Sequence, residues 1–200
     1  MIDSCQTAGF PPKLFFLSAA EAKVRSVYEK EDKSGLCPLC GSKLKGERNT
    51  LFHRKFKSKR DVEATNFGVF FVNRQVRDRI RELSDSEVRF SQVAEDHYIL
   101  RPVSRLLFDD KYDSTIESDG ACSNCGNDLG RSALRVIHGI SVFRAGSVLS
   151  DFGVYRTDIC FGWAPQMEPL IVFGGSIAKT VEKEFSGAFF DECKFVVCQE

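Results

Sequence analysis

The sequence has no apolar run long enough to cross a membrane and no secretion signal at its start. A membrane-spanning helix needs about 20 consecutive, mostly apolar residues, and no stretch of the chain reaches that length. Residues 1–20 lack the basic start and the clean apolar segment of a signal peptide. The 28 basic side chains balance the 28 acidic ones, so the net charge gives no argument for binding nucleic acid or a membrane surface. We therefore expect a cytoplasmic protein without a membrane partner.

Catalytic motifs are missing as well. No Gly-rich phosphate loop occurs, and residues 151–153 match only the three letters Asp-Phe-Gly of a kinase motif, without its companion elements. An active site needs a nucleophile or an open metal position with an acid or a base beside it. Because no such group stands out, the sequence predicts a binding protein and not an enzyme. The three histidines are isolated from one another: His53, His97 and His138.

Cysteine, in contrast, occurs in two matching motifs. The first knuckle is Cys37-Pro38-Leu39-Cys40-Gly41, and the second knuckle is Cys122-Ser123-Asn124-Cys125-Gly126. In each C-x-x-C-G motif a tight turn points two thiolates into one volume, and the glycine accepts the positive φ that the turn needs. Zn²⁺ takes four such ligands at tetrahedral corners. The pattern therefore predicts one structural zinc site with four ligands: Cys37, Cys40, Cys122 and Cys125.

The separation of the two knuckles leaves other interpretations open. Eighty-one residues lie between them (122 − 40 − 1), far more than in a compact zinc ribbon. Loop closure costs little extra at this length, because the cost grows only logarithmically. A redox dithiol, two disulfides or ordinary core cysteines are the alternatives, although Gly41 and Gly126 are poor starts for the helix that follows a redox motif. Disulfides are also rare in the cytosol. Of the other cysteines, we expect Cys160 and Cys193 to be buried free thiols.

Apolar periodicity and helix caps predict an α+β fold with mostly antiparallel sheets and a few short helices. Ser18 and Glu21 form a capping box that predicts a helix over residues 18–33. Asn73 and Ser176 are predicted to cap two further helices, which carry apolar side chains at helical spacing. Strands are predicted at residues 13–17, 68–72, 88–93, 97–103, 134–143, 152–161, 170–173 and 188–197.

Two segments of the chain resemble each other. Phe70-Phe71-Val72, followed by apolar positions 76, 80, 83 and 88, matches Ile171-Val172-Phe173, followed by positions 177, 181, 185 and 190. Each segment follows a knuckle and has the pattern strand, helix, strand. We expect a single domain over residues 1–200 with a zinc-ribbon-like Cys₄ site and an internal duplication, with pseudo-repeats at 36–105 and 121–198. The alternative is that any strand–helix–strand unit produces such a match by chance.

Charge is concentrated in two segments. Residues 43–60, the basic strip, carry eight Lys or Arg side chains against Glu47 alone, with Phe52 and Phe56 among them. Basic side chains interleaved with aromatic ones are typical of a nucleic-acid interface, although a solvated hairpin explains the pattern equally well. Residues 109–120, the acidic loop, lead into the second knuckle.

The two knuckles and the C-terminal segment together resemble a known family. The segment contains Tyr155-Arg156-Thr157-Asp158-Ile159, Pro169-Leu170-Ile171-Val172-Phe173, a short helix and Gly187-Ala188-Phe189-Phe190. Over roughly residues 30–198 the chain is similar to the bacterial double-CXXCG motif immunity proteins, which neutralise polymorphic toxins. The resemblance implies that the four knuckle cysteines are structural metal ligands. It assigns no toxin-contacting residues, because no motif fixes them in the family.

The leading functional hypothesis is therefore a non-catalytic immunity protein that binds a cognate bacterial toxin and is stabilised by zinc. The second is a zinc-ribbon protein that binds nucleic acid through the basic strip, and the third is a structural subunit of a larger assembly. Salt dependence separates the first two, since affinity for nucleic acid falls steeply with salt. For the first hypothesis, the acidic loop suits a toxin with a basic, nucleic-acid-binding cleft, and the basic strip suits a toxin with an acidic surface.

Overall fold

The computed structural model of the chain describes residues 12–21, 37–41, 60–65, 68–108, 118–127, 129–131, 137, 140–144, 149–163 and 167–198. Most of the basic strip and of the acidic loop lie outside these ranges, as do residues 22–33 of the first predicted helix. His53 and His138 lie outside them as well.

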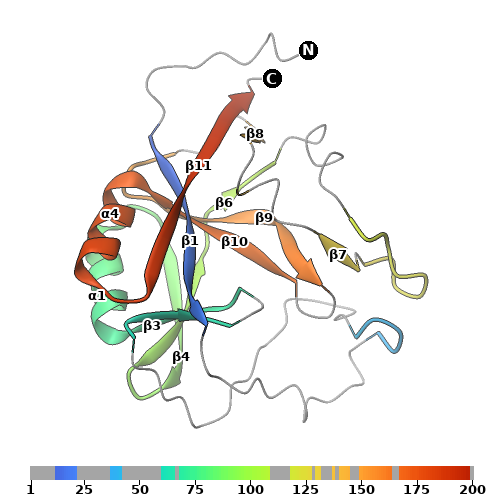
Figure 1. Ribbon diagram of the computed structural model, residues 1–200, viewed down its shortest axis with the longest axis horizontal. Coiled ribbons are helices and arrows are strands. Elements are labelled where there is room, and N and C mark those ends of the chain that lie inside the picture. The colour runs from blue at the N-terminus through green and yellow to red at the C-terminus, as the bar shows by residue number, and fades with distance from the viewer. Residues whose placement is uncertain are drawn as a thin grey trace.

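The first half of the chain forms a four-stranded antiparallel sheet with one helix. Its strands are β2 (Val62–Ala64), β3 (Phe70–Asn73), β4 (Val88–Ala94) and β5 (His97–Pro102), and its helix is α1 (Arg74–Leu83). β3 pairs with β2 and with β5, and β4 pairs with the other edge of β5. α1 therefore carries the chain from β3 to β4, and β5 returns between them (Figure 1). The strand order is β2-β3-β5-β4.

The second half forms a similar sheet that includes the N-terminal strand. Its elements are β9 (Val154–Trp163), β10 (Glu168–Gly174), α4 (Gly175–Glu184), β11 (Ala188–Cys198) and β1 (Leu14–Glu21). β10 pairs with β9 and with β1, and β11 pairs with the other edge of β1, all antiparallel. The order is β9-β10-β1-β11, so the N-terminal strand separates two strands from the end of the chain.

Two short parallel pairings join the sheets. The end of β1 pairs with β2, and β6 (Arg105–Leu106), which follows β5 after two residues, pairs with β9. The paired strands follow the order β4-β5-β3-β2-β1-β10-β9-β6. Since β6 continues β5 along the chain, the last strand of this order comes from the same segment as the second. β7 (Gly130–Arg131) adds to β9, and β8 (Ile140–Arg144) adds to β11. The predicted α+β class with mostly antiparallel pairing is confirmed.

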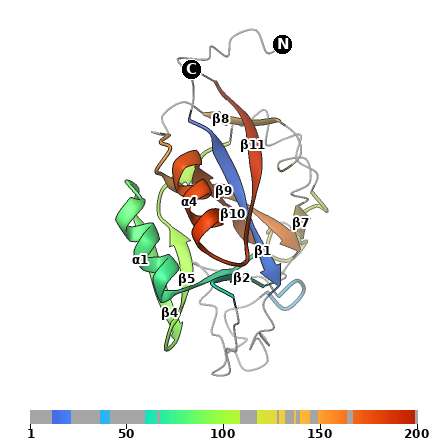
Figure 2. The same cartoon turned by 60° about the vertical axis from the view of Figure 1, so that its left-hand side comes forward.

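The helices and the inner faces of both sheets enclose one hydrophobic core, the shared core. α1 contributes Val76 and Ile80, α4 contributes Ile177 and Val181, and each of the four is at most 1% exposed. Figure 2 shows the two helices side by side. Burying an aliphatic side chain contributes about 1.5–3 kcal/mol, so these positions hold both helices to the sheets. The other buried members are Leu17, Val62, Ala64, Phe70, Val72, Tyr98, Leu100, Val154, Ile171, Phe173, Ala178 and Ala188.

β1 is buried on both of its faces. Leu17 faces the shared core, whereas Leu14 and Phe16 belong to a second cluster on the opposite face of the sheet. Side chains alternate between the two faces of a strand, so a continuous apolar run is expected only where both faces are covered. The other buried members of the second cluster are Leu106, Phe108, Phe143, Tyr155, Phe161, Val172 and Cys193.

The predicted helix over residues 18–33 is wrong at its start. Residues 18–21 continue β1, and Ser18 and Ala19 pair with β11 while the next two residues pair with β2. The hydroxyl of Ser18 donates to the carboxylate of Asp191 (3.1 Å) and caps no helix. Pairing with β11 and then with β2 satisfies backbone groups of residues 18–21, and this tertiary pairing outweighs the local capping signal.

The other two cap predictions have opposite outcomes. Asn73 caps α1 as predicted, and its side-chain oxygen accepts the N–H of Val76 (2.9 Å). The prediction for Ser176 is wrong, because the N-cap of α4 lies two residues earlier, at Gly174, which has no side chain. The carbonyl oxygen of Asp151 accepts the N–H of Ser176 (3.0 Å) and that of the next residue (3.2 Å). A turn from elsewhere in the chain thus replaces the side-chain cap.

Gly174→Ala should destabilise the protein, because a Cβ at this position would lie 2.2 Å from the carbonyl oxygen of Ser150 and 2.5 Å from that of Asp151. Backbone atoms cannot move aside cheaply, so we expect a loss of about 1–3 kcal/mol in the free energy of unfolding, measured with urea. Gly175→Ala is the matched control, since its closest neighbour would be the Cβ of Lys13 at 3.2 Å. An equal loss in both variants would contradict the steric explanation.

Candidate metal centre

Both knuckles adopt the same turn. The N–H of Gly41 donates to the carbonyl of Cys37, and the N–H of Gly126 donates to that of Cys122, each at 2.8 Å. The two glycines have φ values of 72° and 74°, in the region that favours glycine because a Cβ would clash. The predicted reason for each glycine therefore holds in both turns.

The second knuckle is the tip of a short hairpin. Successive backbone hydrogen bonds join residues 119–122 to residues 127–130, at 2.8–2.9 Å. The hairpin ends in β7, which pairs with β9. The second knuckle is thus connected to the sheet through regular backbone pairing. In Figure 1 both knuckles lie at the end of the molecule opposite the helices.

The four knuckle sulfurs gather in one cluster, although the two knuckles lie 85 positions apart in the sequence. The Sγ atoms of Cys37 and Cys122 are 3.7 Å apart, and those of Cys40 and Cys125 are 3.6 Å apart. All four sulfurs lie within 4.8 Å of one another. A tetrahedral ion with metal–sulfur bonds of about 2.3 Å needs sulfur–sulfur distances of about 3.8 Å. The cluster therefore fits one four-coordinate metal ion.

The same distances exclude disulfides within the cluster. A disulfide bond is about 2.05 Å long, and none of the four cysteines forms one. Cys37 and Cys122 are buried, whereas Cys40 and Cys125 are partly exposed. The second knuckle is followed by the return strand of its hairpin and not by the helix that activates a redox dithiol.

The electrostatics of the cluster favour a cation among the sulfurs. The backbone N–H of Cys40 is the largest of the influences that lower the pKa of Cys37, to about 6, and the side chain of Asn124 contributes. For Cys125 the backbone N–H of Asn127 acts in the same direction. Burial and the neighbouring sulfurs nevertheless raise its pKa to about 12. Four thiolates cannot ionise side by side without a positive charge between them, so metal binding should displace protons.

Asn124 supports the cluster from the second knuckle and is not among the residues predicted from the sequence. Its amide Nδ2 donates to the sulfur of Cys37 on the first knuckle, at 3.3 Å. A donor to a ligating sulfur orients the ligand and stabilises its charge. Its polar side chain inside a C-x-x-C motif was the only sequence signal for this role.

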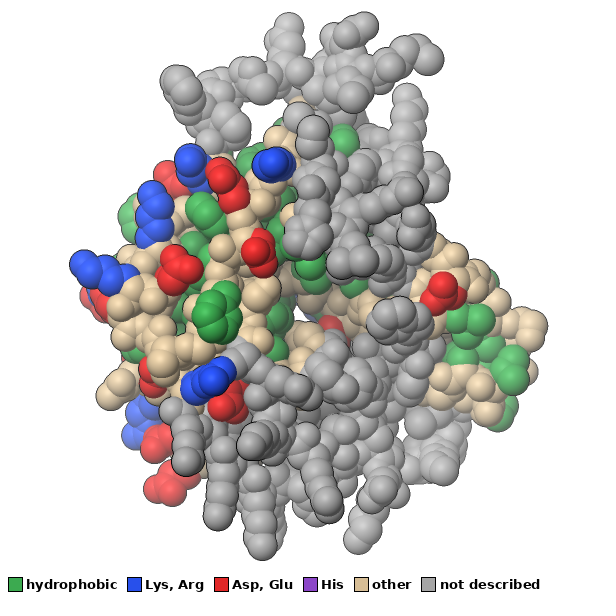
Figure 3. Space-filling model, viewed as in Figure 1, with side chains coloured by type: hydrophobic (Ala, Val, Ile, Leu, Met, Phe, Trp, Pro, Cys, Tyr) green, Lys and Arg blue, Asp and Glu red, His purple; other side chains and the backbone are tan. Residues whose placement is uncertain are grey.

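The described residues of the two knuckles carry no basic side chain. Among residues 37–41 and 118–127 there is no Lys or Arg, and Leu39 is 66% exposed. Figure 3 shows hydrophobic side chains gathered at this end, with basic and acidic side chains interspersed around the helices. The described knuckle residues thus offer no basic side chain for a phosphate.

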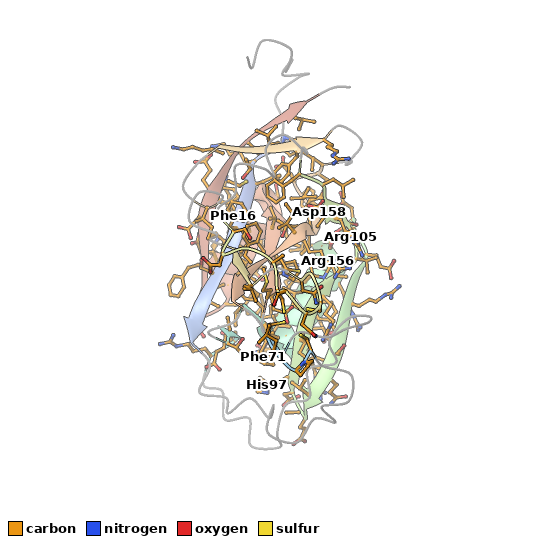
Figure 4. All side chains as sticks on the ribbon, turned by 90° about the vertical axis from the view of Figure 1, so that its right-hand side faces the viewer. Phe16, Phe71, His97, Arg105, Arg156 and Asp158 are labelled. Carbon is orange, nitrogen blue, oxygen red and sulfur yellow. The ribbon has the colours of Figure 1, made fainter. Side chains whose placement is uncertain are left out.

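The remaining candidate residues lie apart from the cluster. His97 is partly buried in β5 beside Phe71 (Figure 4), and burial lowers its pKa. The Asp-Phe-Gly stretch is the turn that caps α4, which explains it without kinase chemistry. Cys193 is buried as predicted, but the prediction for Cys160 is wrong: this thiol is exposed, because it lies on the open side of β9.

Charged residues gather where β6 meets β9. Arg105 and Arg156 are register partners, and Figure 4 shows both near Asp158. The carboxylate of Asp158 accepts the backbone N–H of Phe108 (3.1 Å), so it fixes the chain after β6. No sequence pattern pointed to this group, because its members come from strands that pair only in the folded chain.

Comparison of the chain with protein-family models, curated proteins and solved structures finds no match. Among the described helices, none is long and apolar enough to cross a membrane.

The metal centre predicts one bound ion per chain, measured by elemental analysis of protein purified under reducing conditions. Cys37→Ser and Cys122→Ser should each release the ion. Metal binding to such a site contributes about 10 kcal/mol or more, so both variants should also unfold at much lower temperature. Cys160→Ser is the control, because its exposed thiol lies outside the cluster and should leave the metal content unchanged. Substoichiometric metal in the unmodified protein would contradict the prediction.

Asn124→Ala should weaken metal binding about 10- to 100-fold, the usual cost of losing a group that supports a ligand. The measurement is competition with a chromophoric chelator at fixed pH. Ser123→Ala alters the neighbouring exposed residue of the same turn and should leave the affinity unchanged. Equal effects of the two substitutions would show that the hydrogen bond to Cys37 is unimportant.

Proposed function

We propose that this protein is a non-catalytic immunity protein that binds and neutralises a cognate bacterial toxin, with a structural Zn²⁺ held by Cys37, Cys40, Cys122 and Cys125. The observation that carries the proposal is the closed set of four sulfurs. Four thiolates fill the coordination shell of zinc, so no position is left for a water or a substrate. Such a site stabilises a fold and performs no chemistry.

Zinc is the ion that this donor set favours. Tetrahedral sites with four sulfur ligands select zinc or iron over magnesium, calcium or manganese, which prefer oxygen. Zinc has no redox chemistry of its own, which suits a protein whose function is binding. Elemental analysis that finds iron in place of zinc would leave the ligand set intact and change the proposed ion.

The toxin as partner is supported by the resemblance to double-CXXCG immunity proteins. The knuckles that carry this resemblance contribute the two halves of the sulfur cluster. The C-terminal residues that also carry it form β9, β10, α4 and β11. Both parts of the resemblance thus coincide with described structural elements, the sulfur cluster and the second sheet.

The contact surface is proposed to be one of the two charged segments. The acidic loop ranks first for a toxin that attacks nucleic acid, because the active cleft of such a toxin must be basic. The basic strip is the alternative for a toxin with an acidic surface, and it is also the site of the second functional hypothesis, binding of nucleic acid. A few aromatic or Arg anchors are expected to supply most of the affinity.

The test is co-expression with the secreted toxin encoded next to the gene. Cells should survive only when this protein is present, and the two purified proteins should elute together in gel filtration. Reversing the charge of the acidic loop in one variant and of the basic strip in another shows which segment is used, since only one should abolish protection. A loss of protection is attributed to the contact surface only if the variant still binds metal and unfolds in a cooperative transition.

The opposite outcome of the co-expression test would reject the proposal. Absence of protection and of a complex would reject the toxin as partner. If the protein then binds DNA or RNA tightly and loses that affinity steeply with salt, the nucleic-acid hypothesis replaces the first.

A further inference from the structure

The two halves of the molecule share one strand arrangement. In the order β2-β3-β5-β4 and in the order β9-β10-β1-β11, a hairpin is followed by a helix that leads to the fourth strand of the series. In each half a third strand, β5 or β1, lies antiparallel between the strand before the helix and the strand after it. We call the halves copy one and copy two.

The helices correspond residue by residue. α1 covers residues 74–83 and α4 covers residues 175–184, so both ends differ by 101. At the same offset, buried Val76 and Ile80 correspond to buried Ile177 and Val181. The residue after each helix donates its N–H to the second of these positions, at 2.8 Å in copy one and 3.0 Å in copy two.

The first strands of the two hairpins correspond as well. Val62 of β2 pairs with Val72, and Val154 of β9 pairs with Phe173, which is the position of Val72 plus 101. One hydrogen bond is repeated between the residue before the helix and the residue before the strand: Asn73 N–H to the carbonyl of Asp61 (2.9 Å), and Gly174 N–H to the carbonyl of Gly153 (2.8 Å).

The copies hold each other reciprocally. The end of β1, in copy two, pairs in parallel with β2 of copy one, and β6, the continuation of β5 in copy one, pairs in parallel with β9 of copy two. The turn after the helix of each copy also accepts a hydrogen bond from the first strand of the other copy. Val154 in copy two donates its N–H to the hydroxyl of Ser86 (2.8 Å), and Val62 in copy one donates its N–H to the carbonyl of Ser186 (3.1 Å).

The sulfur cluster also brings equivalent residues of the two copies together. Two sulfur pairs, Cys37 with Cys122 at 3.7 Å and Cys40 with Cys125 at 3.6 Å, each join equivalent positions of the two knuckles. If a rotation axis relates the two copies, equivalent atoms can lie close together only near that axis. The two equivalent helices also lie side by side, at the opposite end of the molecule (Figure 1). An axis from the helices to the knuckles accounts for both contacts.

From these correspondences we infer that the chain is two copies of one unit, related by a twofold axis through the metal centre. The surface by which each copy holds the other, made of the shared core, the two exchanged strand ends and half of a metal site, fits a second copy of the same unit. A chance resemblance of strand–helix–strand units would not reproduce the reciprocal strand pairings and hydrogen bonds between the copies.

The chain order is then a circular permutation of a tandem repeat. β1 comes first in the sequence but occupies, in copy two, the place that β5 occupies in copy one. The β4–β5 turn of copy one lies at Glu95 and Asp96, whereas the equivalent strands of copy two, β11 and β1, come last and first in the element order.

The test is a circular permutant of the full chain, opened between Glu95 and Asp96, with Glu200 joined to Met1. Its strand order is that of the natural chain with the two copies exchanged. Leu14 pairs with Cys193, so Cys198 ends about 17 Å further along the strand. Two residues follow Cys198 and thirteen precede Leu14, and together they can span about 50 Å. No added linker is needed.

We expect the permutant to bind one metal ion per chain and to unfold in a single transition, with a Tm within about 5 °C of the natural chain. A control permutant, opened between Ser186 and Gly187, breaks the link between α4 and β11 within a copy. It should lose metal binding or the cooperative transition. Loss of folding in the first permutant, or equal behaviour of the two, would overturn the equivalence of β1 and β5.

A second measurement does not depend on any variant folding. In a crystal structure of the metal-loaded natural chain, superposing copy one on copy two should require a rotation of about 180°, since a closed two-copy arrangement is twofold. The ion should lie on the rotation axis, with its four sulfurs exchanging in pairs. An ion far from the axis would overturn the shared site, whatever the outcome for the toxin.

Discussion

The pairing of β1 on both of its edges is the interaction on which the rest of the structure depends. The strand lies between β10 and β11 and continues onto β2, so it connects both sheets. Leu14 and Phe16 on one face and Leu17 on the other fill two separate clusters. β1 and β11 are far apart in the sequence, and long-range strand pairing of this kind slows folding. The second sheet therefore needs strands from both ends of the described chain.

The elements that could be predicted are those with local signals. Asn73 carries its own capping oxygen, and the apolar spacing of Val76 and Ile80 marks the buried face of α1. The failures have a non-local cause. At Ser18 a capping box lost to strand pairing with residues far along the chain, and at Ser176 the cap came from the carbonyl of Asp151 in a distant turn. Neither partner is visible from the local sequence.

The metal centre shows the same division. Each knuckle could be predicted as half a site, because the turn and its glycine are encoded in five residues. Whether the two knuckles come together depends on the fold of the sheets and not on the spacing of the motifs in the sequence. Asn124 was missed because its acceptor, the sulfur of Cys37, comes from the other knuckle. Cys160 was predicted wrongly because an apolar run does not show which side of β9 is covered.

The two ends of the molecule are held together by different forces. At the helix end the shared core joins the sheets, and Arg79 adds a two-pronged pair with Glu184 whose exposed position limits its contribution. Among the described residues of the knuckles, only Cys37 and Cys122 are buried. The described knuckle residues therefore contribute little apolar burial, and a metal ion in the four-cysteine cluster would join the two knuckles through two ligands from each. A closed site with no open coordination position is what this role requires.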